Sequence, residues 1–443
     1  MTALYGGFNV KDNDQTSACP NTAALMGRPI EPRPVVETRR PEEMMENMLA
    51  FGGAYMRRVW RVLDRAVGNG VPLVFAAAGP ITVSGAHLHY VNDLLKTGWF
   101  AAISTTDAVC YHDGHRSLNQ HDLTPVHEVA IEGRDIEHRE AEIIRVTNTG
   151  FRGDVLYEQD KFLTAMLLRD EFQYKMSGTE FRHHLGRYYG AQEKAVGAKA
   201  GLLSTCYEHA IPVFVGAPGD GSVFLNAMKL WAMDQANLLT RPFKFELDIH
   251  REVFESCALH YELTHRDEPK QIGIWILGGG VPKNFALQPE PGLIQILGVD
   301  APGYRYDAQI VGADVKDGSL SSCLPDEAYT WEKLDIEALG KDGSEPTAAS
   351  MQADYTMVAP WMAQALLGKR ARYQKLSEEL GDTELFRRHS DAPGYLNRVG
   401  QRRLYDRMPH MTARLIGQIA HDPKNIEFLR NTMEFSLPVM RSL

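Results

Sequence analysis

The sequence predicts a doubly wound α/β fold with a mostly parallel central sheet. Short apolar runs recur between stretches with helical spacing, and several of these runs end in Gly, Ser, Thr or Asp. Continuous apolar strands are typical of a parallel sheet that is covered by helices on both faces. Ligands bind at the carboxyl ends of such strands, so small and acidic residues are expected there.

The strands and helices follow one another along the chain. The expected strands are residues 72–79, 100–106, 211–215, 271–277, 306–314 and 347–354. The clearest helices are expected over residues 41–67, 87–99 and 181–210. The chain from residue 355 onward is expected to be helical, with breaks at Pro393 and Pro409 because proline lacks the backbone N–H that a helix needs.

Composition and length indicate a folded chain with a sizeable core. The 443 residues are 44% hydrophobic and 23% charged, which excludes disordered and collagen-like classes. Residues 1–40 are rich in Pro, Asn, Asp and Gly and are expected to form an extended arm. An α/β body is expected over residues 41–367, followed by a helical C-terminal extension over residues 368–443.

Charge is unevenly distributed. The chain carries a net charge of −10, whereas residues 368–443 hold 14 basic and 9 acidic residues. The acidic body disfavours nucleic acid as a partner and would attract a cationic ligand, although acidity also serves solubility alone. The basic extension either binds the acidic body of a neighbouring chain or is a solvated helix.

The cellular location of the protein is predicted from the membrane, secretory and disulfide signals that its sequence lacks. No apolar run approaches the roughly 18 residues of a membrane helix, and the N-terminus lacks a secretory layout. The five cysteines are scattered without a CxxC pair, which argues against a disulfide framework or a zinc site. We therefore expect a cytoplasmic protein with no membrane partner.

The common motifs of nucleotide enzymes are missing. The segments GNGVPL, GDGSVF and GGGVPK all lack the last glycine of GxGxxG, which disfavours a standard Rossmann dehydrogenase. There is also no Walker lysine loop, GxSxG elbow or HExxH pair.

Four segments at expected strand ends carry the functional signal. They are APGDGSVF (217–224), LGGGVPKNFALQ (277–288), ADVKDGSLSSCLPDEAYTWEKLD (313–335) and QADY (352–355). Each alone fits a tight turn with a capping aspartate. Together they indicate a ligand site at the carboxyl edge of the sheet.

In these segments the chain resembles the deoxyhypusine synthase family, in particular its bacterial deoxyhypusine synthase-like branch, which is homospermidine synthase-like. The resemblance covers about residues 72–362 and is strongest in GGGVPKNFALQ, DGSLSSCLPDEAYTWEK and PGDGSVFLNAM. It implies a Rossmann-like sheet that binds NAD without the glycine fingerprint. It also implies a homotetramer whose active sites lie between paired subunits.

The resemblance implies aminobutyl transfer through an imine on a lysine. NAD takes hydride from the carbon beside an amine nitrogen, and the lysine then holds the aminobutyl group. The family's W-x-K sequence falls on Trp331-Glu332-Lys333, so Lys333 is the expected nucleophile. The alternative is a surface lysine paired with Glu332 or Asp335. A nucleophilic lysine must lose its proton, so burial or neighbouring cations must lower its pKa.

Further site residues follow from the resemblance. Glu327 matches the glutamate that pairs with the substrate amine, and Trp331 matches the aromatic wall over the aliphatic chain. The positions that match the family's NAD contacts are Ser84, Gly85, Thr105, Thr106, Asp220, Gly278, Gly279, Gly280, Asp317, Ala353 and Asp354.

Three departures bear on the substrate. Asn284 stands where eukaryotic members have histidine, and Leu320 and Leu225 stand where they have substrate-binding aspartates. These residues line the expected substrate site and favour a small polyamine, such as putrescine condensing to homospermidine, with spermidine or agmatine as other donors. The alternatives are deoxyhypusine synthesis on a protein lysine and a non-catalytic NAD-binding regulator.

Two histidine pairs allow further hypotheses. In YHDGH (111–115), His112 and His115 could bind a metal, but further ligands at a recognisable spacing are missing. We therefore expect no metal and a His112 that lines the cofactor. Of His183 and His184, one is expected to face the core or a subunit contact.

Overall fold

A six-stranded parallel sheet forms the centre of the molecule. The computed structural model describes residues 31–118, 123–341, 343–381, 392–396 and 402–433. Across the sheet the strands run in the order β7-β2-β1-β9-β10-β11. Their bounds are β1 (Leu73–Ala77), β2 (Phe100–Thr105), β7 (Val213–Val215), β9 (Gly273–Leu277), β10 (Tyr306–Val311) and β11 (Ala348–Gln352).

This strand order confirms the doubly wound α/β fold. From β1 the sheet grows through β2 to β7 on one side, and through β9 and β10 to β11 on the other. That is the 3-2-1-4-5-6 order of dinucleotide-binding folds, in which ligands bind where the direction of winding reverses. The reversal lies between β1 and β9, whose last residues, Ala77 and Leu277, are paired.

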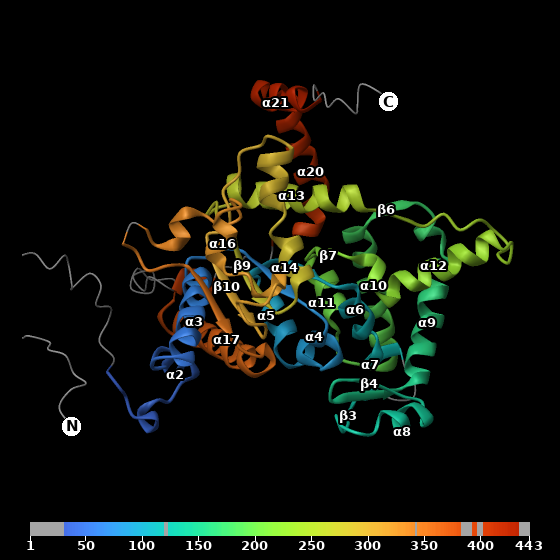
Figure 1. The fold of residues 1–443 in the computed structure, drawn as a ribbon, viewed down its shortest axis with the longest axis horizontal. Helices are drawn as coiled ribbons and strands as arrows, with labels where there is room; N and C mark the ends of the chain where they lie inside the picture. Colours follow the sequence, from blue (N-terminus) through green and yellow to red (C-terminus); the bar gives the residue numbers. More distant parts are fainter. Residues whose placement is uncertain (1–30, 119–122, 342, 382–391, 397–401, 434–443) are drawn as a thin grey trace, which may run out of the picture.

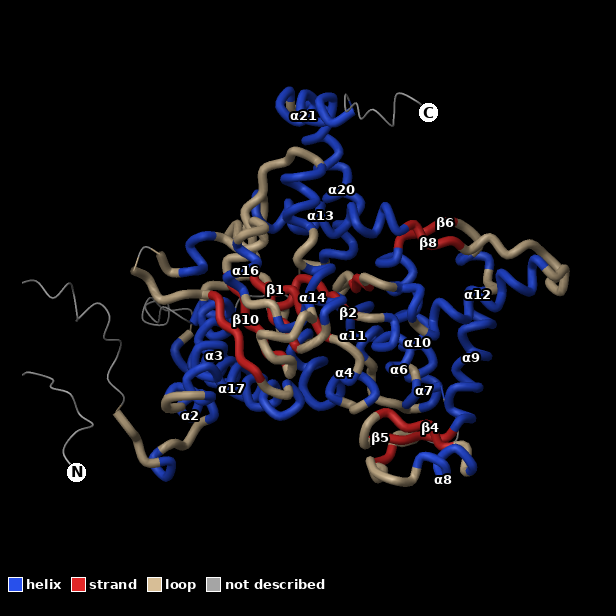
Figure 2. Tube along the Cα trace, in the orientation of Figure 1, coloured by secondary structure: helices blue, strands red, loops and turns tan. Residues whose placement is uncertain are grey.

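Helices cover both faces of the sheet, as Figures 1 and 2 show. One face packs against α3 (Gly52–Gly68), α5 (Asn92–Leu95), α10 (Gly178–Val196), α11 (Leu202–His209) and α17 (Tyr355–Leu380). The other face packs against α13 (Ile249–His265), α14 (Gly280–Ala286) and α20 (Leu404–His421). Along β1, Phe75 belongs to the first core and Val74 and Ala76 to the second, so this central strand is buried on both sides.

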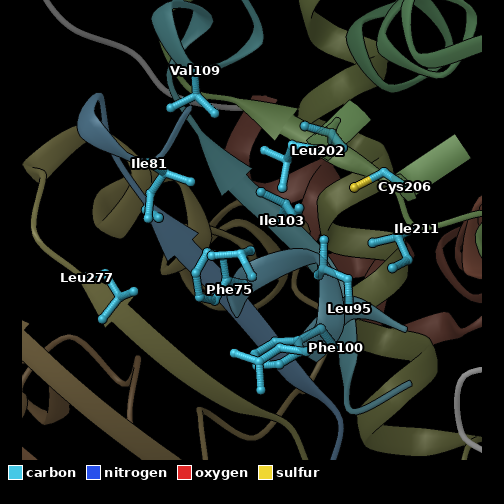
Figure 3. Close-up of a cluster of buried hydrophobic side chains, with 14 of the residues drawn as sticks. Phe75, Ile81, Leu95, Phe100, Ile103, Val109, Leu202, Cys206, Ile211 and Leu277 are labelled. Carbon is cyan, nitrogen blue, oxygen red and sulfur yellow. The ribbon is translucent and has the colours of Figure 1, made fainter. Parts of the chain in front are cut away.

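The first core is built around aromatic contacts on the sheet (Figure 3). The ring of Phe75 meets those of Phe100 and Trp275 edge-on, with centroids 5.5 and 5.8 Å apart. Leu95 and Leu202 reach this layer from the helices that cover it. Such edge-to-face packing adds to the area buried and fixes the positions of the central strands.

Smaller elements surround the sheet. An antiparallel sheet is formed by β3 (His127–Glu128), β5 (Thr149–Arg152) and β4 (Ile143–Val146), and β6 (Lys175–Ser177) pairs with β8 (Glu246–Asp248). The remaining helical segments include α2 (Pro41–Glu46), α4 (Pro80–Val83), η2 (His87–Val91), α6 (Asp107–Asp113), α7 (His115–Leu118), α8 (Asp135–Glu140), α9 (Gly153–Leu167), α12 (Ser222–Gln235), α15 (Pro289–Pro291), η5 (Gly292–Ile296), η6 (Leu320–Ser322), α16 (Pro325–Tyr329), α19 (Ala392–Leu396) and α21 (Pro423–Met433).

Two of the three expected helices are divided, and the third is continuous but shorter than expected. Residues 41–67 form α2 and α3, separated at Phe51, whose φ of 56° is left-handed. Residues 87–95 form one continuous helix, in which the π-helical η2 runs directly into α5, and the helix ends before Lys96. Residues 181–210 form α10 and α11, because Gly197 takes a left-handed φ of 72° and ends the first of them.

The C-terminal extension packs on its own chain. Leu404, Met408, Met411 and Leu415 form one face of α20 and are buried against α13. Pro409 lies inside this helix, so the expected break there is wrong. Burial of the apolar face outweighs the one backbone hydrogen bond that proline removes.

Charge pairing also ties the extension to the body. Arg407 forms salt bridges with Glu262 at 2.6 Å and Asp267 at 2.8 Å, and Arg414 pairs with the same Glu262. The basic extension therefore binds the acidic body of its own chain. The expected arm over residues 1–40 lies mostly outside the described residues. In the part of the chain that the structure describes, no helix has both the length and the apolarity to cross a membrane.

Replacing Leu415 with Ala should lower the free energy of unfolding by about 2–5 kcal/mol, because the side chain is fully buried between α20 and α13. Urea unfolding followed by circular dichroism measures the change. The neighbouring Ile416 is 56% exposed, so Ile416→Ala is the matched control and should change stability by no more than about 0.5 kcal/mol. Equal losses from the two variants would show that α20 is not packed on the body.

Candidate active site

The residues expected to bind the cofactor all lie at the carboxyl edge of the sheet. Ser84 and Gly85 follow β1, and Thr105 and Thr106 end β2. The others follow the remaining strands: Asp220 comes after β7, Gly278–Gly280 after β9, Asp317 after β10, and Ala353 and Asp354 after β11. Because the strands are parallel, these residues share one edge, where nucleotide cofactors bind in this class of sheet.

The loops after β1 and β9 touch at the point where the winding reverses. Gly278 and Gly279 have left-handed φ values of 63° and 73°. A Cβ on Gly279 would lie 2.4 Å from the Cβ of Ala78. Only glycine allows this approach, which leaves backbone open to a ligand in the crevice.

Several of the polar side chains at this edge also stabilise their own loops. Asp317 accepts a hydrogen bond from the amide of Ser319 at 2.8 Å, and Asp354 accepts one from the amide of Thr356 at 2.9 Å. Thr105 is buried and donates to the carbonyl of Ala77 at 2.6 Å, so its hydroxyl joins β2 to β1. The carboxylates of Asp317 and Asp354 remain exposed.

After β10 the chain turns back along the face of the sheet. Leu320 packs beside Gly280, at 3.6 Å from the position of a Cβ there. The carbonyl of Cys323 accepts hydrogen bonds from Lys283 and, at 3.1 Å, from Gln309. Leu334 finally pairs with Tyr304, just before β10 begins.

This return places Lys333 near the amino end of β10. From Tyr304 to Val311 the chain advances about 20 Å at ~3.3 Å per residue. In Figure 1, α16 lies at the upper end of the strands and α4, which follows β1, at the lower end. One chain therefore does not bring Lys333 beside its own crevice at the carboxyl edge.

The backbone around Lys333 is firmly held. Its amide donates to the carbonyl of Ala328 at 3.1 Å, and its carbonyl accepts from the amide of Tyr304 at 2.9 Å. The preceding Glu332 has a left-handed φ of 61°, which directs the chain from α16 toward the sheet. The nucleophile candidate thus lies on a fixed turn.

The side chain of Lys333 is half-buried and forms no ion pair with any residue that the structure describes. Its Nζ lies 5.7 Å from the centroid of the Trp331 ring. Burial lowers the pKa of the Lys333 ammonium, while negative charge on Cys323 and Glu290 acts in the opposite direction. Among the described residues no salt bridge joins Lys333 to Glu332 or Asp335, so the surface-pair alternative does not describe this lysine.

The expected substrate residues divide into two groups. Glu327 lies on α16, and Trp331 and Lys333 lie on the turn that follows it, so these three gather in one place. Trp331 is 56% exposed, and Glu327 is exposed as well. Leu320 is also exposed, on η6 near Gly280.

Asn284 and Leu225 lie on other elements. Asn284 lines a cleft of about 560 Å³ between α14, η5 and the start of α13. Leu225 is 49% exposed on α12. The structure of one chain does not gather these two with Lys333.

Three residues that act on the charge of Lys333, and a fourth that acts on one of these three, were not singled out from the sequence. Lys283 is buried, and burial lowers its pKa, while Asp307 acts in the opposite direction. The pKa of Asp307 is raised to about 7 by burial. Cys323 and Glu290 complete the surroundings of Lys333. Only the fold brings these positions to Lys333, and Glu290 offered just one weak signal, an acid between two prolines.

The histidine pairs have structural contacts. Nδ1 of His112 lies 2.6 Å from Nε2 of His115, whose Nδ1 lies 2.8 Å from Oε1 of Gln159. Burial lowers the pKa of His115 to about 3, so it is neutral. Within the described ranges no three His, Cys, Asp or Glu side chains gather as metal ligands. The role of His112 beside a cofactor stays a prediction. His183 stacks on Tyr405 of α20, with centroids 3.7 Å apart, and so makes a contact within the chain.

Comparisons with known proteins match the sequence of this chain to one family. The family model described as "Deoxyhypusine synthase" matches residues 42–366. The chain belongs to the deoxyhypusine synthase family.

Its relatives in the family include bacterial and archaeal proteins. It is 32% identical to a "Deoxyhypusine synthase-like protein" of Cyanothece sp., over 71% of this chain and 77% of that protein. It is 30% identical to a protein of the same name from Nostoc punctiforme, over 78% and 84%. It is 26% identical to "Probable deoxyhypusine synthase 2" of Methanosarcina mazei, over 75% and 88%. A crystal structure of a proposed deoxyhypusine synthase from Entamoeba histolytica overlaps with a TM-score of 0.44 and 10% identity, over 76% and 96%.

The resemblance to the bacterial branch of the deoxyhypusine synthase family is thereby confirmed. Membership in this family supports an enzyme that transfers aminobutyl groups. The finer assignments of cofactor, substrate and residue roles go beyond these comparisons and are taken up below.

Replacing Gly279 with Ala should weaken binding of NAD and destabilise the fold by about 1–3 kcal/mol, because the new Cβ would meet Ala78 and the residue would keep a left-handed φ. Calorimetric NAD titration and thermal unfolding measure the two effects. Gly312→Ala is the control, since it lies just beyond β10 at the same edge with nothing within 4 Å of its Cβ position. Unchanged binding and stability in Gly279→Ala would contradict the close approach of the two loops.

The amine of Lys333 should react with fluorodinitrobenzene at a lower pH than an ordinary lysine. Burial lowers its pKa, so a larger fraction is unprotonated at a given pH. Peptide mass spectrometry after brief labelling at a series of pH values gives the midpoint, which should lie below about 10.4. The same peptide labelled in the unfolded chain is the internal control. Coincident midpoints would show that the fold does not perturb this lysine.

Proposed function

We propose that this protein is an NAD-dependent aminoalkyl transferase that carries an aminobutyl group as an imine on Lys333. The observation that carries the proposal is the state of this lysine. It is half-buried on a fixed turn, free of ion pairs among the described residues, and lies beside an aromatic ring, and burial lowers its pKa. An amine in this state is a nucleophile rather than a surface charge.

The neighbouring side chains suit a chain with ammonium ends. Trp331 offers a flat apolar face for methylene groups, and its ring attracts a cation. Glu327 lies on α16 within the same segment and would pair with an ammonium group of the substrate. We assign Glu327 and Trp331 to substrate binding and Lys333 to nucleophilic attack.

The carboxyl edge has the features that NAD requires. The left-handed Gly278 and Gly279 leave backbone accessible at the point where the winding reverses, and exposed Asp317 and Asp354 present carboxylates that suit ribose hydroxyls. These residues, with Asp220 and Ser84, would hold the cofactor. Bound there, NAD would accept hydride from the carbon beside the amine nitrogen.

Two subunits are needed to complete such a site. The Tyr304–Leu334 pairing keeps Lys333 at the opposite end of the sheet from its own glycine loops. Large apolar side chains are exposed along the segment that carries it, at Val315, Leu320 and Trp331. We propose that Lys333 of one subunit meets the carboxyl edge of its partner in a homo-oligomer, in agreement with the homotetramer that the family resemblance implies.

The substrate class is a small di- or polyamine. Leu320 and Leu225 are exposed apolar residues where other family members have aspartates, so the far end of the substrate meets fewer carboxylates. We favour putrescine condensing to homospermidine, with spermidine and agmatine as further candidates. A cytoplasmic location is consistent with the four described cysteines, all of which are free thiols.

Two other functions compete with this proposal. Deoxyhypusine synthesis on a protein lysine is favoured by the name of the Methanosarcina mazei relative. A non-catalytic NAD-binding regulator is disfavoured, because a pocket without chemistry has no need of a lysine with lowered pKa at Lys333.

Lys333→Ala should abolish both turnover and the adduct that borohydride traps, while NAD binding persists because the cofactor residues lie at the other end of the sheet. Purified enzyme with NAD is incubated with putrescine, spermidine or agmatine, and intact mass reports the adduct. Lys375→Ala is the control, since Lys375 is exposed on α17. Turnover that survives in Lys333→Ala would remove the mechanism.

The same assay separates the competing functions. Free homospermidine is the product expected of the favoured reaction. Transfer of label from spermidine to a polypeptide would favour deoxyhypusine synthesis. Binding of NAD without any adduct or product would favour the regulator.

A further inference from the structure

A carboxyl group without a partner is buried beside the lysine. Glu290 is the middle residue of α15 and is 0% exposed. Among the described residues, neither of its carboxylate oxygens has a hydrogen-bond partner. Burial of an unpaired carboxylate is costly, so a group of this kind is expected where it serves chemistry rather than stability.

Two other buried carboxyl groups among the described residues, those of Glu252 and Asp113, do have structural partners. Glu252 accepts hydrogen bonds from the guanidinium of Arg182 at 2.5 Å and from the amide of Val215 at 3.0 Å. Asp113 accepts from the amide of Leu202 at 2.8 Å at the start of α11. Glu290 has no such network, so a role in holding the fold does not account for it.

The charges that act on Glu290 come from the segment after α16. Burial raises the pKa of Glu290 to about 7 with help from the charge of Glu332, while Lys333 acts in the opposite direction. On α13, which packs against α15, the thiol of Cys257 lies 3.0 Å from the position of a Cβ on Gly292, and the imidazole of His260 lines the same small cavity as Pro289. Burial lowers the pKa of His260 to about 4, so it is neutral.

The segment after α16 and the segment that holds Glu290 meet at Tyr304, whose amide donates to the carbonyl of Lys333 at 2.9 Å. The hydroxyl of Tyr304 donates to the carbonyl of Ala286 at 2.7 Å, and its side chain lines the same small cavity as Pro289. Lys333 is the cation whose charge acts on this carboxyl group.

We propose that Glu290 is the internal proton acceptor of Lys333, an inference that rests on the proposed imine chemistry. The carboxylate takes one proton from the Lys333 ammonium, which leaves a neutral amine and a carboxylic acid. The amine bonds to the iminium carbon, and the bond from that carbon to the departing nitrogen breaks. After the attack the Lys333 nitrogen carries two protons, and one of them passes to the departing nitrogen, which leaves as a neutral amine with the electron pair of the broken bond. Glu290 returns its own proton to Lys333 once the acceptor amine has displaced the lysine, so protons and electrons balance over the cycle.

Proton exchange between Lys333 and Glu290 requires the lysine side chain to move or a water molecule to bridge the two groups. No hydrogen bond or salt bridge joins the two groups in the described residues, and Nζ of Lys333 lies over Trp331. Exchange therefore takes place after rotation of the lysine side chain or through one bridging water. Glu290 acts through Lys333 and does not itself bind the substrate.

Replacing Glu290 with Gln should slow adduct formation but speed the labelling of Lys333, whereas loss of a negative charge alone would speed both reactions. Adduct formation with putrescine or spermidine plus NAD, trapped by borohydride, should slow by about 100-fold. Labelling of Lys333 by fluorodinitrobenzene near neutral pH should become faster, because loss of the negative charge lowers the pKa of the lysine further. The acid limb of adduct formation against pH should also move, and Glu290→Asp should recover part of the rate.

Matched variants make the result decisive. Glu332→Gln removes the exposed neighbouring acid and should form the adduct at close to the wild-type rate. Glu290→Leu tests the same role with an apolar side chain that suits the buried position, should Glu290→Gln fail to fold. NAD binding reports that each variant is intact.

Two outcomes would overturn the inference. One is adduct formation at the wild-type rate and pH profile in Glu290→Gln or Glu290→Leu. The other is Glu290→Asp that is no faster than Glu290→Gln. Either result would leave the lysine mechanism standing, whereas an active Lys333→Ala would remove the mechanism itself.

Discussion

The parallel pairing of β1 with β9 determines where a ligand can bind. These strands start the two oppositely wound halves of the sheet, and their last residues are paired. Their loops diverge above that pairing and meet through Gly279 and Ala78. Each further strand adds its own polar loop to the same edge because all six strands are parallel. The residues that we propose bind the cofactor are therefore gathered by topology, with no local motif such as GxGxxG needed to bring them together.

The parallel strands bring their loops together at the carboxyl edge, whereas the path of the chain after β10 takes Lys333 away from that edge. It leaves the carboxyl edge at Leu320, is held midway where Lys283 donates to the carbonyl of Cys323, and reaches the amino end where Leu334 pairs with Tyr304. Each fixed point moves the chain farther from its own glycine loops. A lysine held there by backbone hydrogen bonds cannot reach the crevice by rotating its side chain, which spans only about 6 Å. The separation gives a physical reason for a shared site between subunits, and the exposed Trp331 is the kind of side chain that a partner would cover.

Much of the fold could be predicted from the sequence, because buried parallel strands leave continuous apolar runs such as those of β1 and β9. The divided helices could not, since their breaks depend on single left-handed residues such as Phe51 and Gly197. The interior position of Pro409 depends on burial of Met408 and Met411 against α13, which no local signal reports. For the site, the W-x-K pattern located Lys333 through family resemblance. Glu290 escaped notice because it comes near the lysine only through tertiary packing.

The C-terminal extension is part of this packing. Its helix α21 reaches the segment after Glu290, where the ring of Phe428 closes over Gly298 and the amide of Asn425 donates to the carbonyl of Gly298. Gly298 has a φ of 67°, so a side chain there would be strained and would also collide with Phe428. The extension thereby fixes the end of the segment that starts with α15, on the face opposite the first core. A carboxyl group that must stay unpaired and buried needs rigid surroundings, because a mobile segment would expose it to water and return its pKa toward the ordinary value. The extension that the sequence separates from the body thus contributes, in physical terms, to the packing of the segment that carries Glu290.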